Sequence, residues 1–114
     1  MFDIKEPEVK DLPREQYQTL TEQMYYILLA LMEARCGVDI SAKAMEISRR
    51  RIQVGPGTLY TLLGKFEEEK MIAEVRTEGR KRYYQITEKG LDMLKKEYQR
   101  LQMQVEEGRA YLNC

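Results

Sequence analysis

The chain has 114 residues, of which 43% are hydrophobic and 33% charged, so it is long enough for one modest domain and has the composition of a folded protein. It contains no histidine and no apolar run near the ~20 residues of a membrane-spanning helix, and its acidic N-terminus lacks the apolar stretch of a secretion signal. We therefore expect a cytoplasmic protein without membrane association, in which Cys36 and Cys114 are reduced. The sequence does not combine a nucleophile, a general base and a phosphate- or metal-binding motif. We therefore expect no enzyme activity, and hence no catalytic residue, metal or cofactor.

The charges are unevenly distributed, although the formal net charge is zero. Residues 43–52 and residues 76–82 each carry four basic residues and one acidic residue. The acidic residues concentrate instead in the N-terminal arm and at Glu67–Glu69. Two basic segments thus flank one central helix, which is a pattern typical of nucleic-acid binding.

The N-terminal third predicts an arm or short helix over 1–20 and a main helix after it. From Tyr17 to Leu31 apolar residues recur at three- and four-residue intervals, and the capping-box spacing of Thr19–Glu22 places the start of the main helix near Thr21. Gly37 is expected to end it. A second apolar face on the same helix, formed by Tyr25, Leu29 and Met32, predicts packing against a second subunit as well as its own domain.

The central part of the chain predicts a short second helix and then a third helix. Ile40, Ala44 and Ile47 share one helical face, and the helix ends in Ser48 and three arginines. Ile52–Val54 alternates like a short strand, and Gly55-Pro56-Gly57 begins the third helix. The third helix should bury Leu59, Leu62, Leu63 and Phe66. Its small polar surface, suited to a major groove, is formed by Gly57, Thr58, Tyr60, Thr61, Gly64, Lys65 and Glu68.

The C-terminal half predicts a basic hairpin and one long helix. Strands over 72–77 and 81–86 are joined by a Glu78-Gly79 turn, with Ala73, Val75 and Thr77 on one face, and Tyr84 is expected to pack inward. Thr87 caps a helix of about 35 Å, too long to be buried on so small a domain. Apolar residues recur along this helix at alternating three- and four-residue intervals, and this heptad seam predicts dimerisation. The seam consists of Leu91, Leu94, Tyr98, Leu101, Val105 and Leu112.

These residues resemble the PadR family of bacterial transcriptional regulators. The resemblance rests on Met24–Leu31 (MYYILLAL), Pro56–Tyr60 (PGTLY), the stretch FEEE followed by Met71-Ile72, and Arg82–Gly90 (RYYQITEKG). The single C-terminal helix is similar to that of the smaller PadR subfamily. The chain departs from the family where Cys36–Ile40 replaces His-Gly-Tyr-Glu-Ile, and in having no tryptophan on the last helix, where Leu101 falls near the position that stacks ligands in some members.

The resemblance implies an α+β, mainly helical winged helix-turn-helix with an N-terminal extension, a DNA-binding domain over 21–87 and a dimerisation helix over 88–114. It implies a homodimeric repressor that binds a palindromic operator on double-stranded DNA and is released by a signal such as a small molecule. The groove-contacting residues would be Thr58, Tyr60 and Thr61, and the phosphate contacts would come from Lys65, Arg80, Lys81 and Arg82.

Three further groups of residues complete these expectations. The basic run Arg49, Arg50 and Arg51 is a candidate for phosphate contact, because it ends the helix that would cross the DNA backbone. The dimer interface would join Tyr25 and Leu29 to the seam of the last helix. A small-molecule effector in a central opening of the dimer would contact Met24, Met93, Tyr98 and Leu101. The alternative is a winged-helix protein-interaction module without DNA binding, which should expose an apolar patch in place of the basic segments.

Overall fold

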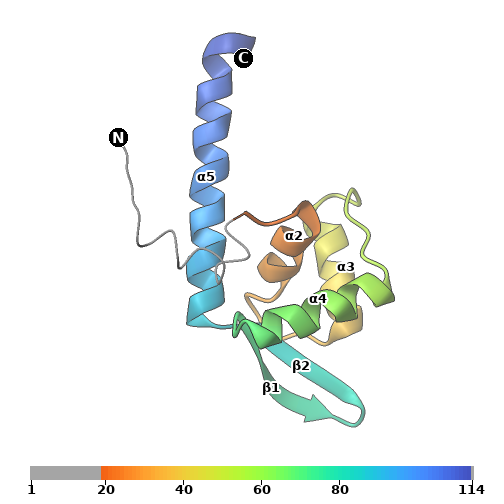
Figure 1. The fold of residues 1–114 in the computed structure, drawn as a ribbon. Helices are drawn as coiled ribbons and strands as arrows, with labels where there is room; N and C mark the ends of the chain where they lie inside the picture. The colour runs from red at the N-terminus through yellow and green to blue at the C-terminus, as the bar shows by residue number, and fades with distance from the viewer. Residues whose placement is uncertain (1–18, 114) are drawn as a thin grey trace.

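The computed structural model describes residues 19–113, so the arm predicted over 1–20 lies outside this range except for its last two residues. A body of three helices and one hairpin carries a long C-terminal helix that projects away from it (Figure 1). The elements are α2 (Glu22–Ala30), α3 (Gly37–Ile47), α4 (Pro56–Glu68), β1 (Ile72–Glu78), β2 (Lys81–Ile86) and α5 (Glu88–Leu112). This is the predicted α+β, mainly helical winged helix-turn-helix.

Helix α2 begins where the sequence predicted, although with a different cap. The Thr21 hydroxyl accepts a hydrogen bond from the Met24 amide at 3.2 Å, and the Met24 sulfur accepts one from the Thr21 amide at 3.4 Å. Glu22, predicted to complete the box from Thr19, instead pairs with Arg51 at 2.6 Å. The prediction that Gly37 ends this helix was wrong, because α2 ends at Ala30 and Gly37 is the first residue of α3.

The predicted strand at Ile52–Val54 does not form, although its alternation is real. Ile52 and Val54 are buried and Gln53 is exposed. Side chains of the α3 region take the place of a partner strand: the Ser48 hydroxyl accepts from the Ile52 amide at 2.9 Å, and the Ser41 hydroxyl donates to the Val54 carbonyl at 3.2 Å. The segment is therefore an extended linker that positions α4.

The wing is an antiparallel hairpin with its turn one residue later than predicted. Glu78 pairs with Lys81, which leaves Gly79 and Arg80 as the turn, with Gly79 at φ 63° in the left-handed region. The register shifts between Glu74 and Arg76, so the regular alternation predicted for Ala73, Val75 and Thr77 is interrupted at Val75. Only Ile72 of β1 is buried, and the rest of the strand lies in solvent.

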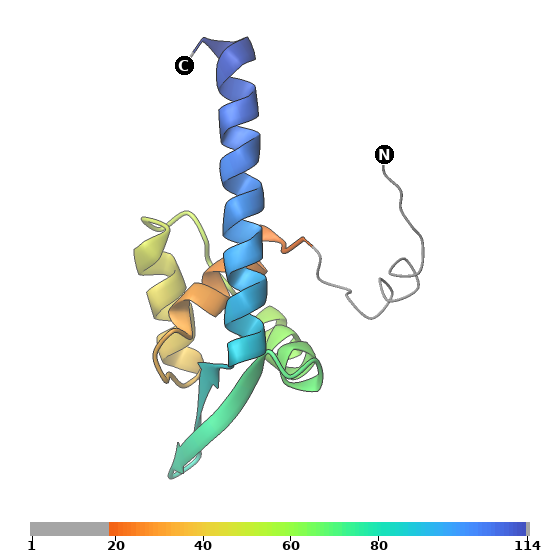
Figure 2. The same ribbon diagram turned by 90° about the vertical axis from the view of Figure 1, so that its left-hand side faces the viewer.

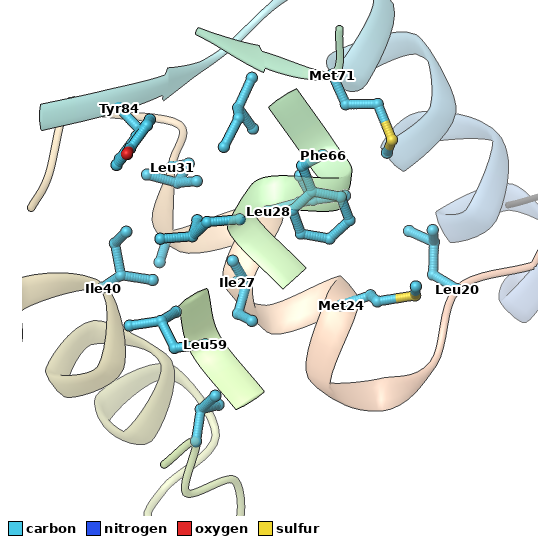
Figure 3. Packing of buried hydrophobic residues seen from close by; sticks show 14 of the residues in the cluster. Leu20, Met24, Ile27, Leu28, Leu31, Ile40, Leu59, Phe66, Met71 and Tyr84 are labelled. Carbon is cyan, nitrogen blue, oxygen red and sulfur yellow. The ribbon is translucent and has the colours of Figure 1, made fainter. Parts of the chain in front are cut away.

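The core lies between α2, α3, α4 and the bases of the wing and α5 (Figure 3). Leu59, Leu63 and Phe66 point into it from α4 as predicted, with Leu62 partly buried beside them. Tyr84 closes it from β2. Leu94 of α5 also belongs to this core, with only 4% of its surface exposed. The heptad pattern had assigned Leu94 to the dimer interface, but the body of its own protomer already covers it.

Helix α5 packs on the body only through its first part. Its buried residues are Gly90, Leu94 and Glu97, and beyond Leu101 every residue except the half-buried Gly108 is exposed up to Asn113. Thr87 caps the helix as predicted, its hydroxyl accepting from the Gly90 amide at 3.1 Å. The remaining turns rise clear of the body in both views (Figures 1 and 2).

Candidate nucleic-acid interface

Helix α4 presents a small polar surface opposite its buried stripe. Pro56 occupies the first turn after the Gly55 N-cap, and no side chain caps the helix, so its first amides have no side-chain partner. Thr58, Tyr60, Thr61 and Lys65 are all exposed, and Tyr60 keeps 55% of its surface accessible. These are the residues predicted for the groove and for one phosphate contact, and the fold places them on one accessible helix.

The wing tip supplies positive charge next to this helix. Arg80 and Lys81 are exposed and form no ion pair with any residue in 19–113. Arg82 differs, because its guanidinium donates to one Glu74 carboxylate oxygen at 3.0 and 2.9 Å and lies 5.6 Å from the centre of the Tyr84 ring. The hydrogen bond to Glu74 raises the pKa of Arg82. The wing therefore presents two exposed cations without a salt bridge among residues 19–113, and a third, Arg82, that is paired with Glu74.

A cleft joins Tyr60 to the wing. It encloses about 180 Å³ and brings together the start of α3, the exposed tyrosine of α4 and the turn of the hairpin. Its lining consists of Cys36, Gly37, Val38, Tyr60, Arg80, Lys81, Arg82 and Tyr84. A predicted groove-contacting residue and the three predicted phosphate contacts of the wing thus line one concave surface.

The three arginines after α3 lie at the other end of that helix. Arg49 and Arg50 are exposed and adopt left-handed backbone conformations, with φ of 56° and 69°. Arg51 turns toward α2, donating to Glu22 at 2.6 Å and to the Tyr26 hydroxyl at 2.9 Å. The 11 residues of α3 separate this run from the cleft by about 16 Å. The structure therefore does not join the arginines to the wing, and Arg51 already has an acidic partner.

Two other expectations for aromatic and thiol groups concern the same region. The Arg76 guanidinium lies 4.0 Å from the centre of the Tyr83 ring and pairs with Glu78 at 2.8 Å, so one face of this ring is covered. Cys36 is buried, and its thiol lies 3.4 Å from a carboxylate oxygen of Asp39. Neither group adds to the exposed surface of α4.

A larger apolar groove lies between α2 and the projecting part of α5. It measures about 920 Å³ and is lined by Tyr25, Tyr26, Tyr98, Gln99, Leu101, Gln102, Met103, Val105, Glu106 and Glu107. Of the four residues predicted for an effector pocket, Tyr98 and Leu101 line this groove. Met24 is buried in the core and Met93 packs against it, so neither reaches the groove in this protomer. Tyr26 also lines the groove and was missed, because it directly follows Tyr25 and helical spacing places it on a different face.

The predicted dimer residues fall into two sets. Tyr98, Val105 and Leu112 are exposed along α5, with Leu101 and Leu91 half-buried. Tyr25 and Leu29 are partly buried against the core. The apolar heptad residues of α5 therefore divide by position. Leu94, near the start of the helix, packs on the body of the same protomer, whereas the later residues are accessible to a partner.

Comparisons with known proteins identify the fold. Residues 27–96 match the profile of the transcriptional regulator PadR-like family. The chain belongs to this family. A PadR-like transcriptional regulator from Bacillus cereus is 26% identical, with a TM-score of 0.64, over 81% of this chain and 91% of that one. A PadR family transcriptional regulator from Eggerthella lenta is 20% identical, with a TM-score of 0.66, over 92% of this chain and 88% of that one.

A transcriptional regulator from Clostridium thermocellum has the same fold, at 18% identity and a TM-score of 0.66, over 90% of this chain and 95% of that one. No curated protein matches the sequence. As a PadR-like chain the protein is a DNA-binding transcriptional regulator, and the β1–β2 hairpin is the wing of its winged-helix fold. Within residues 19–113, no helix is long and apolar enough to cross a membrane, and no three acidic or cysteine residues gather as metal ligands.

Proposed function

We propose that this PadR-like regulator is a homodimeric repressor that binds a palindromic operator. The observation that carries the proposal is the shared cleft of Tyr60 and the wing cations, of which Arg80 and Lys81 are exposed and form no salt bridge among the described residues. Helix α4 would enter the major groove with Thr58, Tyr60 and Thr61, while Lys65 and the wing contact the flanking phosphates. Arg49 and Arg50 would contact the backbone beyond the other end of α3.

The exposed part of α5 supports the homodimer. Val105 and Leu112 keep 62% and 71% of their surface accessible, although both are large apolar residues in register on one helix. A second copy of the same helix would cover them, since equivalent surfaces meet across a two-fold axis. The two recognition helices would then reach successive major grooves about 34 Å apart, which requires a palindromic site.

The apolar groove beside α5 supports release by a small molecule. Its lining combines aromatic and aliphatic side chains of α2 and α5 with two glutamines and two glutamates of α5, and the same part of α5 would face the partner protomer. An apolar effector bound there would change the angle between the two α5 helices and hence the spacing of the recognition helices. Repression would follow from occupancy of a promoter, and the effector would end it. The regulator would act in the cytoplasm of a bacterial cell.

The proposal is tested by selecting the tightest binders from a pool of random duplexes at several salt concentrations. Enrichment of a palindrome, with affinity falling steeply as salt rises, supports it, because phosphate neutralisation releases counterions. Sedimentation of the complex then gives the stoichiometry, and transcription from a promoter overlapping the selected site distinguishes repression from activation. Absence of enrichment with weak binding at low salt would refute it and favour a protein-interaction module.

A further inference from the structure

Gly37, the first residue of α3, lies directly under the side chain of Tyr60. A methyl group at position 37 would overlap the Tyr60 hydroxyl oxygen and lie 2.9 Å from Cζ of the ring. Gly37 is buried, although the ring above it is largely exposed. The tyrosine of the recognition helix therefore rests on the backbone of the neighbouring helix.

The backbone of position 37 does not itself require glycine. Among the described glycines only Gly79 has a positive φ, so an alanine could adopt the conformation of Gly37 without strain. Alanine is also the better helix former by about 1 kcal/mol within a helix. Glycine at this position thus has one evident consequence, which is the space for the Tyr60 ring.

The Tyr60 ring also lines the cleft between α3 and the wing. Val38 follows Gly37 at the start of α3, while Arg80, Lys81 and Arg82 line the same cleft from the wing. A tyrosine on an open helix surface exchanges among rotamers, and ordering it on binding reduces the affinity. With its hydroxyl end against the backbone of Gly37, Tyr60 has fewer conformations to lose when it binds a ligand.

We propose that Gly37 is a positioning residue, which holds Tyr60 in the orientation that reads bases and so helps to set the sequence preference of the regulator. This inference rests on the proposed function, in which α4 enters the major groove. Gly37 does not itself contact a base. Its effect on DNA passes through the tyrosine, so it disappears when the tyrosine is removed.

The test compares Gly37→Ala, Tyr60→Ala and the double variant. Each is measured for its relative affinity for the selected operator and for operators altered at single base pairs. Gly37→Ala is expected to reduce the discrimination at one base pair of each half-site about five- to tenfold, which is the lower end of the range for one well-placed base contact. In the Tyr60→Ala background it should change discrimination by less than about twofold.

The matched control is Val38→Ala. Val38 is the next residue, lines the same cleft and is 74% exposed, but the substitution removes volume and leaves the space under Tyr60 unchanged. Its discrimination should equal that of the wild type. Nuclear magnetic resonance of ring-labelled tyrosine in DNA-free protein should show displaced Tyr60 signals for Gly37→Ala and unchanged signals for Val38→Ala.

The outcomes separate this inference from the proposed function. A wild-type protein that selects no operator overturns the proposed function and the inference together. If the operator is selected but Gly37→Ala leaves discrimination intact, or acts equally in the Tyr60→Ala background, only the inference fails. Should Gly37→Ala not fold, the wild type provides the test through the nuclear Overhauser contact between the Gly37 α-protons and the Tyr60 ring. Persistence of that contact on operator DNA supports the inference, and its loss overturns it.

Discussion

The carbonyl oxygen of Met71 lies so close to Gly90 that a methyl group at position 90 would overlap it. The same oxygen accepts a hydrogen bond from the Thr87 amide at 2.9 Å, and the Thr87 hydroxyl donates to the Lys70 carbonyl at 2.7 Å. The start of α5 is thereby fixed to the corner that follows the recognition helix. A rotation of α5 would consequently move the corner at the end of α4 with it.

Gly90→Ala should destabilise the protein because α5 must shift away from this corner. The added methyl would also lie 2.9 Å from Cγ1 of Ile86. We expect a loss of about 1–3 kcal/mol in the free energy of unfolding, as for other overpacked sites. Gly64→Ala is the control, since nothing lies within 4 Å of its added methyl group, and it should be neutral or stabilising by up to about 1 kcal/mol. Urea denaturation measures both, and equal effects of the two variants would contradict the close approach.

The wing cations should contribute to DNA affinity without regard to sequence. Arg80→Ala and Lys81→Ala should each lower the slope of log affinity against log salt by about 1, with equal loss on the operator and on random DNA. Arg51→Ala should cost less, because Arg51 must first give up Glu22. Fluorescence anisotropy titrations at several salt concentrations give the slopes. A larger loss from Arg51→Ala than from either wing variant would place the phosphate contacts at the other end of α3.

If the exposed apolar residues of α5 form the dimer interface, a charged side chain introduced among them should weaken dimerisation. Val105→Glu would bury an unpaired carboxylate there and should raise the dimer dissociation constant at least about tenfold. Gln104→Glu is the matched control: the neighbouring residue is exposed and gains the same charge. It should leave the dissociation constant within about twofold. Sedimentation equilibrium decides between them, and equal association of both variants would remove Val105 from the interface.

Local patterns in the sequence predicted the elements well because each depends on nearby residues. The buried stripe of α4 follows from apolar spacing alone, and the Thr87 cap from a single hydroxyl before a helix. Contacts between distant segments were not readable in this way. Leu94 continues the heptad seam in sequence, yet it is buried because α2 happens to pack beside it, and Arg51 reads as a solvated cation until Glu22 of α2 approaches it.

The site shows the same division. The exposure of Thr58, Tyr60 and Lys65 followed from helical periodicity. The cleft between Tyr60 and the wing depends on how α3 and β2 pack, with Arg35 and Tyr84 joined by a pair of backbone hydrogen bonds of 3.0 and 2.9 Å. No pattern in the nearby sequence indicates that a glycine leaves space for a side chain 23 positions further along the chain. Gly37 therefore reads as a helix end until the structure brings Tyr60 over it.

Glu97 should make the stability of the protein depend on pH below about 4.5, the ordinary pKa of its carboxyl. It is buried in α5 and accepts two hydrogen bonds from Arg100, at 2.9 and 2.5 Å. The Arg100 hydrogen bonds lower the pKa of Glu97, and the Leu20 backbone amide adds to this, whereas burial opposes it. Because the folded pKa lies below the unfolded one, the stabilisation is complete above the unfolded value and is lost as the pH falls through the folded value.

Glu97→Gln should therefore cost stability at neutral pH and less in acid. We expect a loss of about 1–3 kcal/mol at pH 7, the range for a buried hydrogen bond to a charged group. The difference from the wild type should shrink as the pH falls below about 4.5. Glu106→Gln is the control, because its pair with Arg109 is exposed on both sides and should contribute about 1 kcal/mol or less. Thermal unfolding of the three proteins between neutral and acid pH tests this, and a difference for Glu97→Gln that stayed constant with pH would show that the carboxyl acts through packing rather than through its charge.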